Sequence, residues 1–141
     1  MKKYVGIWVD HEKALVASII KNEEINKENI HCIESLVEGH VRLSGGSRSS
    51  TPYGPQDVAS EKSIDKRRNY HLRQYYQKII RQIQDCQKVL IFGPGEAKLE
   101  LEKEIRKLKG LAGKLVGVEA ADKMTERQVA AKVRRYFIQA L

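Results

Sequence analysis

The chain has 141 residues and a formal net charge of +8 at pH 7, from 26 lysines and arginines against 18 aspartates and glutamates. This length corresponds to one ordinary domain, residues 1–141, and a hydrophobic fraction of 41% is enough for one packed core. No stretch reaches the roughly 18 apolar residues of a membrane span. Polar residues 10–13 also interrupt the N-terminal apolar run before the core of a signal peptide is complete. We therefore expect a single cytoplasmic domain without a membrane partner; the oligomeric state is left open.

The cysteines and histidines show no metal-binding pattern. Cys32 and Cys86 lie far apart without a Cys-x-x-Cys pair, which favours buried free thiols. The four histidines also lack the spacing of metal ligands; they are His11, His31, His40 and His71. We predict no structural zinc and no cofactor.

The N-terminal quarter of the chain predicts three strands. Residues 3–10 are β-branched and aromatic with a loose alternation, which predicts a strand. Residues 14–20 are expected to be its hairpin partner, and residues 30–37 a weaker third strand. The links between them are short. This arrangement favours an antiparallel meander.

A long loop and a long helix are predicted next. Residues 38–61 contain glycines, prolines and five serines without any apolar period, which predicts a long flexible loop, either functional or disordered. Residues 62–85 predict a helix, because apolar side chains recur at spacings of four, three and four. These side chains, which we expect to face the sheet, are Leu72, Tyr76, Ile79 and Ile83.

The C-terminal half alternates strands with helices. We predict a strand at 88–92, a helix at 96–109, a strand at 114–119 and a last helix after Thr125. A sharp turn at residues 93–95 leads into the first of these helices, and Gly110 is expected to cap its end. Thr125 and Gln128 form a capping box for the last helix, which should bury Val129, Val133 and Phe137.

The predicted order is therefore β-β-β-α-β-α-β-α. A meander followed by βα repeats predicts an α/β fold, with a mixed five-stranded sheet and helices on its faces. The ribonuclease H-like architecture has this order. So do the translational machinery components, which lack the nuclease site.

Basic residues are concentrated between His40 and Asp85. This segment has nine basic and four acidic residues, an excess of five. Such an excess indicates a polyanion partner, usually nucleic acid, or else a solvated helix face. Arginines can hold phosphates in bidentate geometry, and a tyrosine among them can stack on a base. The expected RNA-binding residues are Arg42, Arg48, Lys66, Arg67, Arg68, Tyr70 and Arg73.

Two motifs resemble a known family. Gly93-Pro94-Gly95, with Lys98 soon after, and the run Lys66-Arg67-Arg68-Asn69-Tyr70 are similar to motifs of the middle domain of eukaryotic and archaeal class I release factors and Pelota. The resemblance follows the element order over nearly the whole chain. It implies a bacterial release-factor-like protein with the ribosome, and ribosomal or transfer RNA, as partners.

The resemblance also implies a catalytic loop. In that family a Gly-Gly-Gln loop places water against the peptidyl-tRNA ester. Here Gly45 and Gly46 supply the glycine pair, Ser47 stands where the glutamine would follow, and Gln56 is the only glutamine in the predicted loop. The expected catalytic residues are therefore Gly45, Gly46 and Gln56, in peptidyl-tRNA hydrolysis on the ribosome.

Other classes of function stay open. A non-catalytic RNA-binding module would use the same basic surface without Gln56. A metal-dependent nuclease of ribonuclease H-like fold needs several converging carboxylates. Asp10 ends the first strand, but the central strand at 88–92 offers no carboxylate, and Asp10 can instead cap the hairpin turn.

Overall fold

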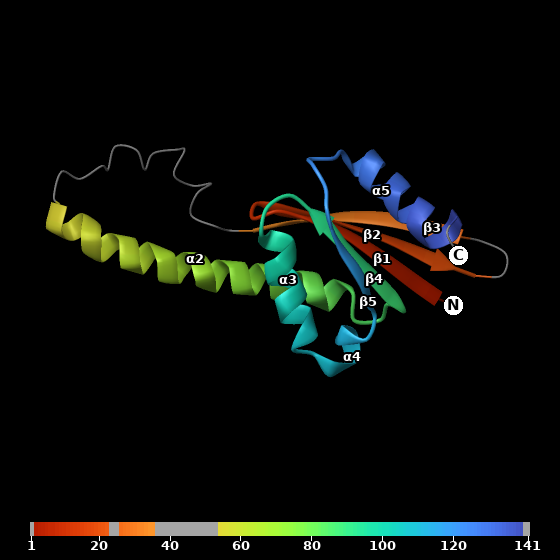
Figure 1. Cartoon of the computed structure of the whole chain (residues 1–141), viewed down its shortest axis with the longest axis horizontal. Helices are drawn as coiled ribbons and strands as arrows, with labels where there is room; N and C mark the ends of the chain where they lie inside the picture. The colour runs from red at the N-terminus through yellow and green to blue at the C-terminus, as the bar shows by residue number, and fades with distance from the viewer. Residues whose placement is uncertain (1, 23–25, 36–53, 140–141) are drawn as a thin grey trace.

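A computed structural model of the protein describes residues 2–22, 26–35 and 54–139, and these residues form a five-stranded mixed sheet with helices on both faces (Figure 1). The strands are β1 (Lys2–Val9), β2 (Lys13–Lys21), β3 (Asn26–Glu34), β4 (Lys88–Gly93) and β5 (Leu115–Ala120). They lie in the order β3-β2-β1-β4-β5. The first three pair antiparallel, whereas β4 is parallel to β1 and β5 is parallel to β4. The predicted α/β class and mixed sheet are confirmed.

Strand β1 is central and is covered on both faces. Val5, Ile7 and Val9 point into one core, and Tyr4 and Trp8 point into the other. All five are buried. A strand covered on both sides needs apolar side chains at nearly every position, which explains why β1 alternates only loosely.

Helix α2 (Gly54–Gln82) packs on the first of these cores through the predicted side chains. Leu72, Tyr76, Ile79 and Ile83 are all buried, as the spacing predicted. The helix begins at Gly54, however, and not at residue 62, so residues 54–61 are not loop. Pro55 lies in the first turn, where a missing N–H is tolerated and the fixed φ suits a helix.

The predicted helix at 96–109 is interrupted. Helix α3 (Ala97–Arg106) ends with Lys107 as its C-cap, and the short helix α4 (Lys109–Ala112) follows. Gly110 therefore lies within α4 and does not cap α3. The break lets Leu111 reach the same core as Leu101 and Ile105, which a straight helix would not place there. The predicted element order lacked α4.

Helix α5 (Glu126–Arg134) and the π-helical turn η2 (Arg135–Gln139) cover the opposite face of the sheet. The capping box is confirmed: the backbone N of Gln128 donates to Thr125 Oγ1 at 3.2 Å, and the backbone N of Thr125 donates to Gln128 Oε1 at 2.9 Å. A Cβ atom on Gly6 would meet Val133 Cγ2 at 2.2 Å. Glycine at this position therefore lets α5 pack directly on the backbone of β1.

Strand β3 differs from its prediction in two respects. It begins at Asn26, earlier than predicted, because Lys21 and Asn26 already pair across the hairpin and cross-strand pairing overrides polar composition. Cys32 is exposed and free, while Cys86 is buried and free. The expectation of two buried thiols is thus wrong for Cys32, since β3 is an edge strand that the helices cover incompletely.

Candidate nucleic-acid interface

The basic residues predicted on α2 gather on its solvent-facing side. Lys66, Arg67, Tyr70 and Arg73 are exposed, and Arg68 is half-buried. Among the α2 side chains that the structure describes, residues 66–82, the buried apolar ones begin at Leu72. At about 1.5 Å per residue, the 29 residues of α2 span about 43 Å, and its N-terminal part projects past the sheet (Figure 1). The basic residues therefore lie where the helix leaves the body of the protein.

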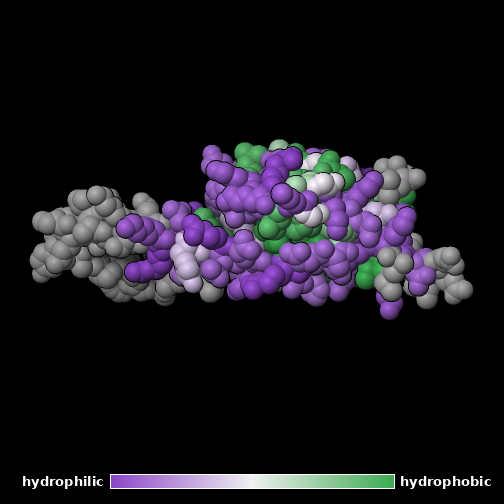
Figure 2. Space-filling view, turned by 90° about the horizontal axis from the view of Figure 1, so that it is seen from below, coloured by the Kyte–Doolittle hydropathy of each residue, from purple (hydrophilic) through white to green (hydrophobic). Residues whose placement is uncertain are grey.

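Charges on this face are poorly compensated. Lys66, Arg68 and Arg73 have no ion-pair partner among the described residues. Viewed from below Figure 1, the surface over this side of the molecule is mainly hydrophilic (Figure 2). Tyr70 lies among these cations on α2, and 55% of its surface is exposed. An exposed aromatic ring among unpaired cations suits base stacking beside phosphate contacts.

Two hollows flank α2. A groove of about 230 Å³ runs between α2 and α3 and is lined by Asn69, Leu72, Arg73, Tyr76, Glu100, Lys103 and Glu104. A hollow of about 260 Å³ lies on the side of β3 and is lined by Glu34, Tyr70, His71, Gln74, Tyr75 and Lys78. Nδ1 of His71 is buried there without a hydrogen-bond partner among the described residues. Sequence reasoning missed both hollows, because each joins α2 to an element distant in the chain.

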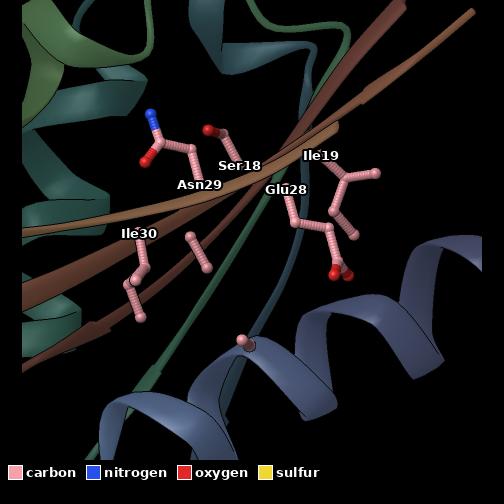
Figure 3. Close-up of a pocket in the computed structure, with 7 residues that line it drawn as sticks. Ser18, Ile19, Glu28, Asn29 and Ile30 are labelled. Atoms are coloured by element: carbon pink, nitrogen blue, oxygen red, sulfur yellow. The ribbon is translucent and has the colours of Figure 1, made fainter. Parts of the chain in front are cut away.

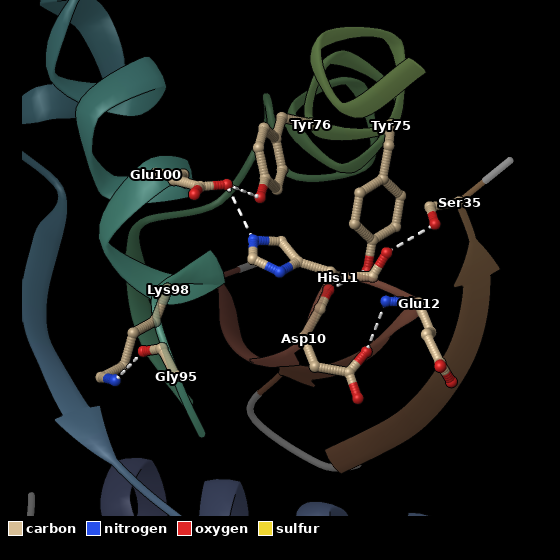
Figure 4. A network of polar contacts seen from close by, with 9 residues as sticks. All are labelled: Asp10, His11, Glu12, Ser35, Tyr75, Tyr76, Gly95, Lys98 and Glu100. Carbon is tan, nitrogen blue, oxygen red and sulfur yellow. Dashed lines mark hydrogen bonds and ion pairs between the residues drawn. The ribbon is translucent and has the colours of Figure 1, made fainter. Parts of the chain in front are cut away.

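Polar contacts anchor α2 at the carboxyl edge of the parallel strands (Figure 4). The Tyr76 hydroxyl donates to Glu100 Oε1 at 2.6 Å, and His11 Nε2 lies 3.0 Å from the same oxygen. Burial, and then the hydrogen bond to Glu100, raise the pKa of Tyr76 above its usual value. Tyr76 is therefore a neutral donor that joins α2 to α3.

A second anchor joins α2 to the β1–β2 turn. The Tyr75 hydroxyl donates to the backbone carbonyl of Asp10 at 3.0 Å. Oδ1 of Asp10 accepts from the backbone N–H groups of Glu12 and Lys13, both at 2.8 Å. The Asp10 carboxylate therefore caps the β1–β2 turn, as the second interpretation of this residue in the sequence expected. No group of three or more metal-ligating side chains occurs in the described part of the chain.

The turn at residues 93–95 sits at the end of β4. Gly93 has φ +150°, and a Cβ there would meet the carbonyl oxygen of Val9 at 2.3 Å; Gly95 has φ +65°. Both conformations favour glycine. Lys98 Nζ donates to the carbonyl oxygen of Gly95. These contacts explain the Gly-Pro-Gly pattern as a sharp strand-to-helix turn that orients α3.

A further small cavity lies on the other face of the sheet. It measures about 220 Å³ and lies between β2, β3 and α5. Ile19, Glu28 and Ile30 point toward α5, whereas Ser18 and Asn29 point away from it (Figure 3). Glu28 pairs with Arg134, whose Nη2 lies 3.1 Å from Oε2. The cavity is apart from α2 and is not part of the interface.

The structure places only some of the predicted site residues. It brings Lys66, Arg67, Arg68, Tyr70 and Arg73 together on α2. Gln56 belongs to the first turns of α2 and not to a loop. The remaining predicted residues lie outside the described part of the chain; they are Arg42, Gly45, Gly46 and Arg48. None of the described helices is long and apolar enough to cross a membrane.

Comparisons with known proteins give structural matches only. The sequence matches no protein-family profile, and no curated protein is significantly similar to it. Pelota from Thermoplasma acidophilum is 14% identical, with a TM-score of 0.48 over 98% of this chain and 32% of that protein. The archaeal translation termination factor aRF1 is also 14% identical, with a TM-score of 0.49 over 98% of this chain and 39% of that protein. The chain thus spans about a third of the length of each.

Proposed function

We propose that the chain is a ribosome-associated translation factor, of the termination or rescue type, which binds ribosomal or transfer RNA through α2. The observation that carries the proposal is a group of cations, Lys66, Arg68 and Arg73, that form no ion pair with other described residues. They lie beside the exposed Tyr70 on a helix that projects from the sheet. Cations hold the RNA backbone through phosphate contacts, and an exposed ring stacks on bases without needing a particular sequence. The similarity of residues 66–70 to the release-factor motif supports the ribosome as the partner.

The anchoring contacts suit this role. The projecting part of a helix has a defined position only if the part that packs on the sheet is held rigidly. Tyr75 and Tyr76 connect the sheet-packed part of α2 to the β1–β2 turn and to α3, respectively, and both rings are buried. The basic residues are therefore held in a defined place relative to the sheet, and Arg73 also lines the groove beside α3.

The test is ribosome co-sedimentation over a range of salt concentrations. We expect the variant with Arg67, Arg68 and Arg73 all changed to Gln to bind more weakly. Its salt slope should be shallower by about 2–3, because each lost phosphate contact removes about 0.7–0.9 from the slope. The matched control changes three exposed cations elsewhere, Arg106, Lys107 and Lys109, to Gln. Equal slopes for the α2 variant and the control would place the RNA contact elsewhere. Absence of wild-type binding at low salt would refute the proposal.

Peptidyl-tRNA hydrolysis is a second candidate activity. The observation in its favour is the place of Gln56, in the first turns of α2 at the end that points away from the sheet (Figure 1). A glutamine amide can accept from water through its carbonyl and donate through its NH₂ group. Gly45 and Gly46, the other residues proposed for this step, precede that end of the helix in the sequence.

A further inference from the structure

A second basic surface lies on helix α5 and beside it, since Arg127 is in α5, Lys123 precedes the helix and Arg135 begins η2. Lys123, Arg127 and Arg135 are exposed and have no ion-pair partner among the described residues. Residues 121–139 contain five basic and two acidic residues, an excess of three. The two acidic residues are Asp122 and Glu126, both exposed. This part of the chain therefore has its own positive field, separate from that of α2.

The other two cations of residues 121–139, Lys132 and Arg134, already have partners. Lys132 Nζ lies 3.1 Å from Glu119 Oε1 and 5.3 Å from the centre of the Phe92 ring. Arg134 pairs with Glu28 of β3. These contacts tie the helix to β5, β4 and β3. The unpaired positive charge of this segment thus comes from Lys123, Arg127 and Arg135, on and beside a helix whose orientation is fixed.

The outward face of α5 is also hollowed. A depression of about 380 Å³ is lined by Lys123, Met124, Gln128, Ala131, Lys132 and Arg135. In sequence order, the lining begins with the cation Lys123 and ends with the cations Lys132 and Arg135. The lining residues between them are Met124, Gln128 and Ala131. The shape and charge suit a phosphate backbone that lies along the helix, with Gln128 able to donate to an oxygen.

Nucleic acid fits this face better than an anionic membrane does. A helix that lies on a membrane needs an apolar face directed at the lipid. The apolar side chains of α5, Val129 and Val133, are fully buried against the sheet. No large hydrophobic residue of α5 is among the exposed ones; those in the described chain are Tyr70, Leu99, Leu108 and Val116.

The two basic surfaces lie on opposite faces of the sheet. Helix α2 packs on the core that contains Ile7, and α5 packs on the core that contains Trp8 (Figure 1). A short RNA bound along α2 cannot reach α5, because the sheet lies between them. We propose that α5 is a second RNA-backbone site, and that the protein bridges two RNA segments. The choice of RNA as the polyanion rests on the proposed function, but the site itself is independent of α2.

The experiment counts RNA molecules bound per protein. A short RNA hairpin, too small to span both faces, is titrated at low salt, and the stoichiometry is read by native mass spectrometry. We expect two hairpins on the wild type and on the control with Arg106, Lys107 and Lys109 changed to Gln. One hairpin is expected after Lys123, Arg127 and Arg135 are changed to Gln, and one after the triple change on α2.

The outcomes separate the two proposals. One hairpin on the wild type, none on the α2 variant and one on the α5 variant would overturn the second site and leave the α2 interface intact. One hairpin on the α5 variant with two still on the α2 variant would overturn the α2 interface only. Wild-type protein without any bound hairpin would overturn both. Binding to phosphatidylserine vesicles that requires the α5 cations, with no loss of RNA by the α5 variant, would make α5 a membrane contact instead.

Discussion

The hydroxyl of Tyr76 on α2 lies 2.6 Å from Oε1 of Glu100 on α3. Both residues also line the groove between the two helices. The hydrogen bond therefore connects the sheet-packed part of α2, the proposed RNA-binding helix, to α3. His11 Nε2 contacts the same carboxylate oxygen, so the contact also joins the turn after β1 to α2 and α3.

Removing the Tyr76 hydroxyl should destabilise the protein. We expect Tyr76→Phe to lower the free energy of unfolding by about 1.5–3 kcal/mol, the range for a hydrogen bond to a charged group. Urea unfolding measures this change. Tyr70→Phe is the matched control, because Tyr70 is exposed and its hydroxyl donates no hydrogen bond to any residue that the structure describes. Equal unfolding midpoints for the two variants would mean that the contact with Glu100 contributes nothing to stability.

The two anchoring tyrosines predict a loss of stability at high pH. Burial raises the pKa of Tyr75 and of Tyr76 above the usual value near 10. Above that pH the unfolded chain loses these protons while the folded protein keeps them, so the unfolded state binds fewer protons. Stability must then fall as pH rises beyond about 10.

The double variant Tyr75→Phe/Tyr76→Phe isolates this contribution from that of the lysines. Its free energy of unfolding should fall less steeply between about pH 10 and 11.5 than that of the wild type. Urea unfolding at a series of pH values gives both slopes. Parallel curves would show that the two hydroxyl groups titrate alike in the folded and unfolded states.

The close contact between α5 and β1 predicts that a side chain at position 6 will destabilise the protein. Gly6→Ala places a methyl group against Val133 Cγ2, and we expect a loss of about 1–3 kcal/mol from overpacking. Gly113→Ala is the control, since Gly113 has φ −74° and open space around it. Adding Val133→Ala to Gly6→Ala should recover part of the loss, because the two side chains compete for one volume. Additive losses in the double variant would contradict this explanation.

The hydrolysis proposal depends on Gln56. We expect Gln56→Ala to lower peptide release from programmed ribosomes by about 10² or more, the scale of losing a positioned catalytic group. Ribosome binding should not change, because the cations at 66–73 are untouched. Gln84→Ala, an exposed glutamine that follows α2, is the control. Normal release by Gln56→Ala would remove its proposed role. A wild type that binds ribosomes and releases nothing would favour the non-catalytic RNA-binding module.

The sequence by itself determined the elements whose signal is local. The four-three-four spacing of α2 marked the face that the structure buries, and the Thr125–Gln128 capping box marked the start of α5. Both signals are local patterns: the apolar spacing follows the helical period, and the capping box joins residues three apart. The grouping of Lys66, Arg67 and Arg68 on one stretch of α2 was predictable because the three residues are consecutive in the sequence.

Only the tertiary structure decided how these elements meet. The start of α2 at Gly54 moved Gln56 from a loop into a helix, although glycine and proline content indicated loop. The break between α3 and α4 places Leu111 in the core, and Cys32 is exposed because β3 lies at the sheet edge. The contact of His11 and Tyr76 with one oxygen of Glu100 joins three segments far apart in the chain. No local pattern encodes such a contact, because it exists only once the strands have paired and the helices have packed on their faces.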